Sequence, residues 1–169
     1  MLHRSSKPTI AALPGAAAGA ACSIALSCDL RVASEKAFII TSFLRLGLSG
    51  DYGGTWFLTQ LVGPAKAREI YFTADRVDAA TCLELGIFNR VVPAEQLAEE
   101  AFGLAARIAA GPPIATRWMK ANLNRALEAD LETCLRYEAD RMVRGALTDD
   151  YVEAVAAFAE KRKPEFEGR

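Results

Sequence analysis

Two short stretches rich in small residues hold the groups of this chain that could do chemistry. In the first, Lys7–Ser23, an apolar β-type run breaks at Pro14-Gly15, and a segment with little side-chain bulk then enters a helix. In the second, residues 45–56, Asp51 lies among glycines just before another helical pattern. Backbone N–H groups at the start of a helix favour developing negative charge. An anion-stabilising turn and one carboxylate together predict proton transfer next to a carbonyl.

Each of these features also has a purely structural interpretation. Asp51 beside a glycine is a common turn or N-cap residue for the helix that follows, and Gly15–Ala21 could serve close packing of a helix on a sheet. Ser23 is not predicted to be a nucleophile, because no Gly-x-Ser-x-Gly elbow surrounds it and the single histidine is His3. Gly53-Gly54 is too short for a phosphate-binding loop. The residues alone therefore leave Asp51 open between a structural and a chemical function.

Length and composition limit the function classes. The 169 residues fit one domain with a substantial core, 51% of them are hydrophobic, and the formal net charge is −1. A nearly neutral chain does not predict binding to nucleic acid or to an anionic membrane surface. No apolar run reaches the roughly 20 residues of a membrane span, and the first residues do not read as a signal peptide. We expect a cytoplasmic protein with no nucleic-acid or membrane partner.

The cysteines and the histidine predict no metal site. The cysteines lack the spacing of zinc or redox motifs and lie in apolar surroundings, so we expect buried free thiols in a cytosolic protein. His3 falls in a terminus that we expect to be frayed, which argues against a histidine-based triad. The four cysteines are Cys22, Cys28, Cys82 and Cys134.

Hydrophobic patterning predicts an α/β region, residues 1–92, followed by a helical region, residues 93–169. Gly63-Pro64 and Gly86 are stop signals for helices, and Pro113 suits the first turn of a helix. Short apolar runs predict strands at Thr9–Leu13, Leu30–Ala33, Phe38–Thr41 and Asn89–Val92. Helical patterns between them cover residues 19–27, 54–61, 65–72 and 79–85, and amphipathic stripes recur after Val92.

Several separate strings also carry a family resemblance. They begin with Lys-Pro-Thr-Ile-Ala-Ala-Leu-Pro-Gly at residue 7 and continue in residues 25–34, 47–55, 61–69, 85–92 and 158–166. In this order they resemble the enoyl-CoA hydratase/isomerase, or crotonase, superfamily over nearly the whole chain. The resemblance implies an α/β fold: a crotonase-type spiral of ββα units, here partial, followed by a C-terminal helical trimerisation region.

The same resemblance implies an enzyme for acyl-CoA thioesters, with no cofactor beyond the coenzyme A of the substrate. Family members hold the thioester oxygen between two N–H donors, and the second donor maps to Ala20, which follows Gly19. Phe43 is interpreted as apolar lining of the acyl pocket or as plain core, and Gly50 directly precedes Asp51 in its turn. These positions imply substrate binding by Gly19, Phe43 and Gly50.

The C-terminal tail is a second place where the resemblance implies substrate binding. Lys161 and Phe166 map near the nucleotide of the coenzyme A of a neighbouring subunit, and a solvated tail is their plain alternative. The implied partners are therefore an acyl-CoA substrate and further copies of the chain, as a homotrimer or a dimer of trimers.

Two departures from the family pattern favour one reaction over another. The paired glutamates with which hydratases activate water map to Ser23 and Phe43, and neither can act as a carboxylate. Asp51 maps to an aspartate of certain enoyl-CoA, dienoyl-CoA and phenylacetate-pathway ring-epoxide isomerases, and residues 47–56 look most like the last group. One carboxylate can lift a proton from one carbon and return it two carbons along. We expect an isomerase in which Asp51 and the Ala20 N–H are catalytic; a hydratase using Asp51 and a water is the alternative.

The chain is also shorter than typical family members at its N-terminus, where the first oxyanion donor and the adenine-binding loop reside. The resemblance therefore predicts a truncated member or a fragment. It leaves a further alternative from a different class: an inactive or purely structural subunit that only assembles through its helical region.

Overall fold

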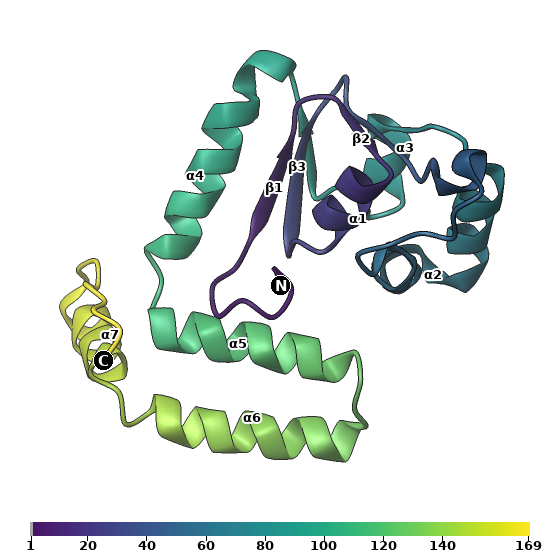
Figure 1. Ribbon diagram of the computed structural model, residues 1–169. Helices are drawn as coiled ribbons and strands as arrows, with labels where there is room; N and C mark the ends of the chain where they lie inside the picture. The colour runs from purple at the N-terminus through teal and green to yellow at the C-terminus, as the bar shows by residue number, and fades with distance from the viewer. Residues whose placement is uncertain (1) are drawn as a thin grey trace. The chain divides into compact units, whose positions relative to one another are not determined.

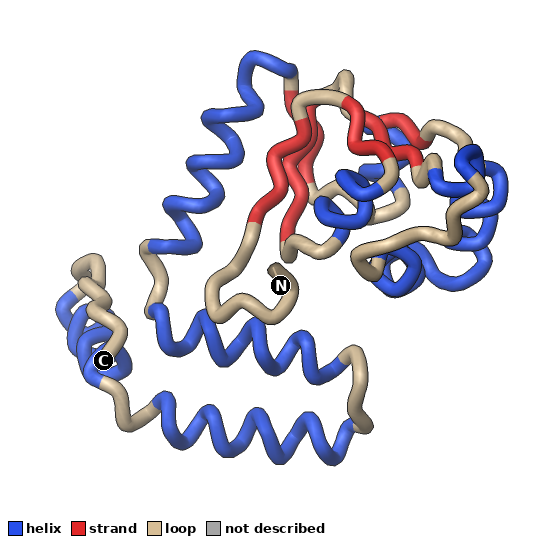
Figure 2. Tube along the Cα trace, in the orientation of Figure 1, coloured by secondary structure: helices blue, strands red, loops and turns tan. Residues whose placement is uncertain are grey.

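The computed structural model describes residues 2–169 and divides them into two compact units. The first unit holds Thr9–Ala105 together with Leu2 and His3, and the second holds Arg4–Pro8 and Ala106–Arg169. Figure 1 shows the strands within the first unit, and Figure 2 shows that the chain after them is almost entirely helical. An α/β region therefore precedes a helical region in this structure.

Two small sheets form the frame of the first unit. One has the strand order β1-β3-β6 and is parallel throughout, with β3 in the centre. The other has the order β2-β4-β5, in which β2 pairs parallel and β5 antiparallel with β4. Their strands are β1 (Ile10–Leu13), β3 (Leu30–Ser34), β6 (Arg90–Val92), β2 (Ala16–Ala18), β4 (Phe38–Ile40) and β5 (Val77–Asp78).

Several helices of the first unit begin at a small residue, alanine or glycine. The longest has non-helical backbone at Gly63, with φ 76° and ψ 166°, directly before Pro64, which confirms the predicted stop signal. Only glycine adopts that backbone conformation without strain. The elements are α1 (Ala20–Leu26), α2 (Gly54–Thr73), α3 (Ala79–Glu84), the 3₁₀ turns η1 (Phe43–Leu46) and η2 (Ala94–Gln96), and α4 (Leu97–Ala109), which continues into the second unit.

The second unit contains three further helices, α5 (Pro113–Ala126), α6 (Leu131–Gly145) and α7 (Asp149–Glu160). Pro113 occupies the first turn of α5, as predicted. Side chains cap the other two: Asp130 accepts from the Thr133 N–H at 2.7 Å, and Thr148 accepts from the Tyr151 N–H at 3.2 Å. Caps of this kind satisfy N–H groups that have no acceptor within the helix.

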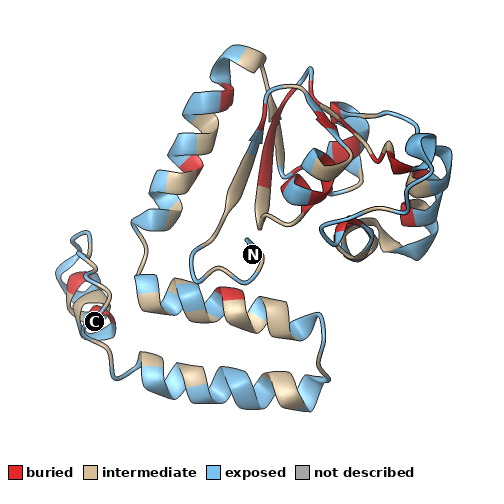
Figure 3. Cartoon of the chain, viewed as in Figure 1, coloured by how far each residue is buried: buried red, intermediate tan, exposed pale blue. Residues whose placement is uncertain are grey.

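The core of the first unit contains a buried cation, Arg31 on β3. Its Nε donates to the Ile87 carbonyl at 2.5 Å and its Nη1 to the Cys28 carbonyl at 2.6 Å, while its backbone N–H donates to Asn89 Oδ1 at 2.8 Å. Burial lowers the pKa of this guanidinium. Figure 3 shows buried positions gathered on β3 and α1, and Arg31 ties these elements to the chain that leads into β6.

The four predicted strands are confirmed, whereas two details of the sequence analysis are wrong. His3 is not frayed, because its ring packs edge-on against Trp56 and Phe57 with centroid distances of 5.6 and 5.2 Å. Of the four free cysteines, Cys22 and Cys82 are buried as expected, but Cys28 and Cys134 are only half-buried. Between residues 2 and 169, no helix has the length and apolar character that crossing a membrane requires.

Candidate active site

Gly19 joins β2 to the start of α1 and fixes the position of the Ala20 N–H. The Gly19 N–H donates to the Ile40 carbonyl at 2.9 Å, and the Gly19 carbonyl accepts from the Ser23 N–H at 3.1 Å. With φ 52° and ψ −121°, this position demands glycine. Ala20 is the first residue of α1, so its N–H has no acceptor within the helix and can donate to an external oxygen.

Phe43 and Ser23 occupy the two positions that map to glutamates in hydratases. Phe43 is buried at the start of η1, and its ring edge lies 3.9 Å from the point where a Cβ at Gly19 would stand. Ser23 Oγ has less than 1 Å² of accessible surface and no hydrogen-bond partner of good geometry among residues 2–169. Neither side chain can activate a water, and Ser23 cannot touch a ligand without movement.

Asp51 lies in an exposed turn that closes on itself, because the Gly54 N–H donates to the Asp51 carbonyl at 3.0 Å. The N-cap of α2 is Gly53, and within the described chain no side chain caps this helix. The structure therefore does not support the interpretation of Asp51 as a helix cap. It leaves the carboxylate on the surface of the first unit.

Sequence reasoning missed Tyr71, which α2 places against this same turn. A Cβ at Gly50 would lie 3.5 Å from Tyr71 Cε1, and a Cβ at Gly54 would lie 2.6 Å from the Tyr71 hydroxyl oxygen and 2.3 Å from Ser23 Oγ. Burial raises the pKa of Tyr71 to about 12, and Asp51 adds to this increase through its negative charge. The one signal in the sequence is an aromatic ring with a polar tip, directly after Ile70 and four residues after Ala67 in a helical pattern.

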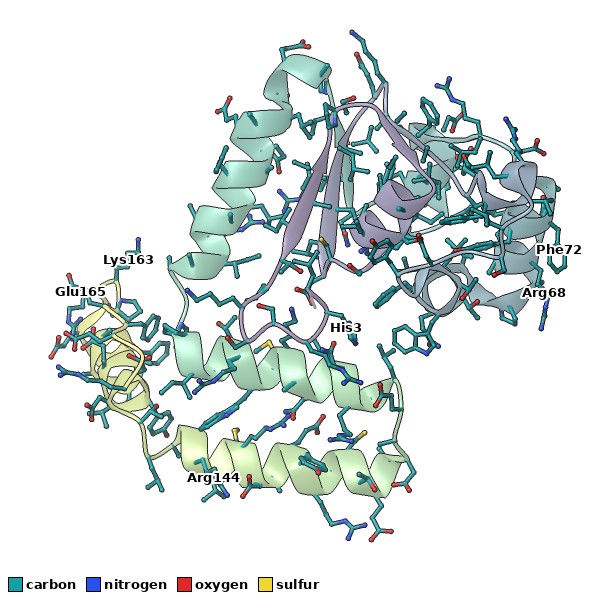
Figure 4. The ribbon with its side chains drawn as sticks, in the orientation of Figure 1. His3, Arg68, Phe72, Arg144, Lys163 and Glu165 are labelled. Carbon is teal, nitrogen blue, oxygen red and sulfur yellow. The ribbon has the colours of Figure 1, made fainter. Side chains whose placement is uncertain are left out.

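A cavity of about 260 Å³ opens next to these residues within the first unit. Its lining is mainly apolar, with hydroxyl groups from α2 and from the loop between η1 and α2. Figure 4 labels two of the lining residues, Arg68 and Phe72, on α2. The residues that matter here are Phe43, Leu48, Thr55, Ala67, Tyr71 and Phe72. A cavity of this kind can hold a short apolar chain.

The remaining predicted site residues, Lys161 and Phe166, belong to the second unit. Lys161 ends α7 in the left-handed conformation and is exposed, whereas Phe166 is half-buried in the tail that follows. Arg162 holds this tail on α7 through a two-pronged ion pair with Glu153, at 2.6 and 2.8 Å. Figure 4 shows Lys163 and Glu165 in the same tail beyond α7. The structure thus groups Gly19, Ala20, Phe43, Gly50 and Asp51 in one unit and the tail residues in the other.

The described residues offer no cluster of three or more histidine, cysteine, aspartate or glutamate side chains that could hold a metal ion. Comparison with known proteins then decides the family. All residues, 1–169, match the family described as Enoyl-CoA hydratase/isomerase. The chain belongs to this family.

Two relatives of this family member carry different activities in their names. The short-chain-enoyl-CoA hydratase of Clostridium acetobutylicum is 38% identical over 159 residues, which cover 94% of this chain and 61% of the relative. The 1,2-epoxyphenylacetyl-CoA isomerase of Escherichia coli is 36% identical over 168 residues, which cover 99% of this chain and 64% of the relative. Hydratase names are the more frequent among the relatives compared.

Solved structures confirm the fold. A crystal structure of an enoyl-CoA hydratase subunit from Geobacillus kaustophilus superimposes with a TM-score of 0.95 at 40% identity, covering 99% of this chain and 65% of the other. The crotonase-type α/β fold expected from the sequence is therefore present. The chain spans 61–65% of the length of these three relatives, so the whole protein's reaction is a matter for proposal.

Proposed function

We propose that this protein isomerises an acyl-CoA thioester, with Asp51 as the acid/base and the Ala20 N–H as an oxyanion donor. The observation that carries the proposal is which of the mapped positions hold a carboxylate. Asp51 is an exposed carboxylate without a capping function, while the positions of the hydratase glutamates hold a buried hydroxyl, Ser23, and an apolar ring, Phe43. Proton transfer by one carboxylate fits this set, and water activation by a pair of carboxylates does not.

The proposed reaction moves one proton and one double bond. The Asp51 carboxylate removes a proton from the carbon next to the thioester carbonyl of a 3-enoyl-CoA, and the electron pair passes to the carbonyl oxygen. The Ala20 N–H stabilises that oxygen while the dienolate exists. Asp51, now protonated, returns the proton two carbons along the chain, which leaves a 2-enoyl-CoA and the original carboxylate. Because α1 has only seven residues, the hydrogen bond from the Ala20 N–H should stabilise the oxygen more than the helix dipole does.

The cavity beside Phe43 is the proposed site of the acyl chain, with Gly19 and Gly50 allowing close approach of the thioester. We further propose that the tail residues Lys161 and Phe166 contact the coenzyme A nucleotide, and that the helices of the second unit join copies of the chain into a trimer or a dimer of trimers. Exposure of Lys161 and partial exposure of Phe166 are compatible with such contacts. No redox or metal group is needed for the proton transfer.

A hydratase that uses Asp51 and a bound water is the second candidate, because hydratase names are frequent among the relatives. Two substrates separate the candidates. Conversion of a 3-enoyl-CoA to its 2-enoyl isomer, without hydration of crotonyl-CoA, is the expected result. Hydration of crotonyl-CoA without movement of the 3-enoyl double bond would reject the isomerase. A protein that binds both thioesters and changes neither would favour the non-catalytic subunit.

A further inference from the structure

The same side chain, that of Tyr71, lies next to both ends of the turn that carries Asp51. Gly50 approaches the ring of Tyr71, where a Cβ would stand 3.5 Å from Cε1, and Gly54 approaches the phenol oxygen, where a Cβ would stand 2.6 Å away. Between them, the Gly54 N–H closes the turn on the Asp51 carbonyl at 3.0 Å. The side chain of Tyr71 therefore lies against this turn at both Gly50 and Gly54.

A second hydroxyl group lies close to the hydroxyl of Tyr71. It projects from α2, and its hydroxyl and the hydroxyl of the buried Ser23 both lie within 2.6 Å of one point, the Cβ position at Gly54. With a pKa of about 12, the phenol keeps its proton at neutral pH and can act as a donor. Ser23 Oγ has less than 1 Å² of accessible surface, so it cannot contact a ligand without movement.

The ring of Tyr71 also lines the cavity that we assign to the acyl chain. One side chain thus contacts both the space for the substrate and the turn that bears the carboxylate. We propose that Tyr71 is a positioning residue, whose phenol sets where Asp51 stands relative to the acyl chain. This inference rests on the proposed function, and it assigns no bond-making step to Tyr71 itself.

Three variants test the proposal in the purified protein. Tyr71→Leu removes the ring from Gly50 and the hydroxyl from Gly54, Tyr71→Phe removes the hydroxyl alone, and Phe102→Leu is a matched control on the exposed face of α4. We expect kcat for the 3-enoyl-CoA to fall about 10²-fold in Tyr71→Leu, because a displacement of about 1 Å can have that effect. Tyr71→Phe should recover part of this loss, and Phe102→Leu should match wild type.

Hydrogen exchange of the Gly54 amide supplies a readout that needs no turnover. In Tyr71→Leu we expect this amide to exchange faster while amides of β3 stay protected, because only the turn loses its support. Unchanged exchange at Gly54, or unchanged kcat, in Tyr71→Leu would overturn the proposal. An inactive wild type would instead refute the proposed function, and the exchange measurement would still decide whether Tyr71 holds the turn. If Tyr71→Leu does not fold, the same comparison is made with Tyr71→Phe. If that variant has the wild-type exchange rate at the Gly54 amide and the wild-type kcat, the proposed contact of the hydroxyl with the turn is rejected.

Discussion

At the scale of single residues, the proposed site depends on which oxygen atoms of the protein a substrate could reach. Asp51 is exposed and Ser23 Oγ is not, although both were visible in the sequence as polar residues near glycines. The local pattern was sufficient to predict that Asp51 lies in a turn, because a glycine-rich turn is encoded by neighbouring residues. Tyr71 could not be found in the same way, since its contact with Gly50 joins positions in two different elements.

The crowded contact at Gly54 leads to the first prediction. Gly54→Ala places a methyl group 2.3 Å from Ser23 Oγ, and overpacking of this kind typically costs about 1–3 kcal/mol of unfolding free energy. Gly103→Ala is the matched control, because Gly103 lies in helix α4 with no atom within 4 Å of its Cβ position. That control should be neutral or gain up to about 1 kcal/mol. Urea unfolding of both variants checks this, and equal stabilities would contradict the close contact.

Thiol reactivity gives a second prediction at this scale. Burial raises the pKa of Cys22 and of Cys82 to about 12, so neither forms a thiolate near neutral pH. Cys28 and Cys134 are half-buried and accessible in part. Because the thiolate is the reactive form, a thiol reagent should label Cys28 and Cys134 well before the other two, as mass spectrometry of the native protein can show. Early labelling of Cys22 would contradict the described core.

At the scale of elements, the strands that could be predicted from the sequence are those whose side chains form a recognisable apolar run. The strand-like runs around Leu30 and Phe38 are apolar and bounded, and they form β3 and β4. β2 was missed because Ala16–Ala18 has no side-chain pattern and becomes a strand only by pairing with β4. β5 has two residues, too few for any periodicity. The prediction of a frayed terminus at His3 was wrong for a similar reason, since the aromatic partners of His3 lie far along the chain.

The third prediction concerns the tail on α7. Arg162 holds the pKa of Glu153 at about 2, below its usual value of 4.5, and the Glu165 N–H also donates to this carboxylate. Because the pKa in the folded state is lower than in the unfolded state, the contact stabilises the tail fully above pH 4.5 and is lost as the pH falls toward 2. The amide signal of Glu165 in NMR should therefore move in this range.

Glu153→Gln provides the control for the tail, because it removes the charge while keeping the size of the side chain. The Glu165 amide of this variant should resemble the acid form already at neutral pH. A signal that stays fixed on acidification in wild type, or that is identical in the variant, would show that the ion pair does not hold the tail.

At the scale of the whole molecule, the fold was readable from family motifs, whereas assembly remains a prediction. The second unit exposes large apolar side chains that a soluble monomer rarely leaves in one region. They include Met119, Leu131, Met142 and Leu147, with 63%, 75%, 78% and 81% of their surface exposed. We expect sedimentation to show a trimer or a larger species. The variant Met142→Glu should shift the distribution toward smaller species, because assembly would then bury a charge at the contact between copies. A wild-type monomer would contradict the proposed assembly.

The central claim is that one carboxylate, Asp51, moves the proton in the reaction. Replacing it by asparagine keeps the size of the side chain on an exposed turn but removes the base, so the fold should remain. The most direct measurement is the rate at which wild type and Asp51→Asn convert a 3-enoyl-CoA to the 2-enoyl isomer, with circular dichroism as the check on folding. We predict a loss of about 10²–10⁴-fold, the usual contribution of a general acid/base. A folded Asp51→Asn variant with near wild-type turnover would contradict the account.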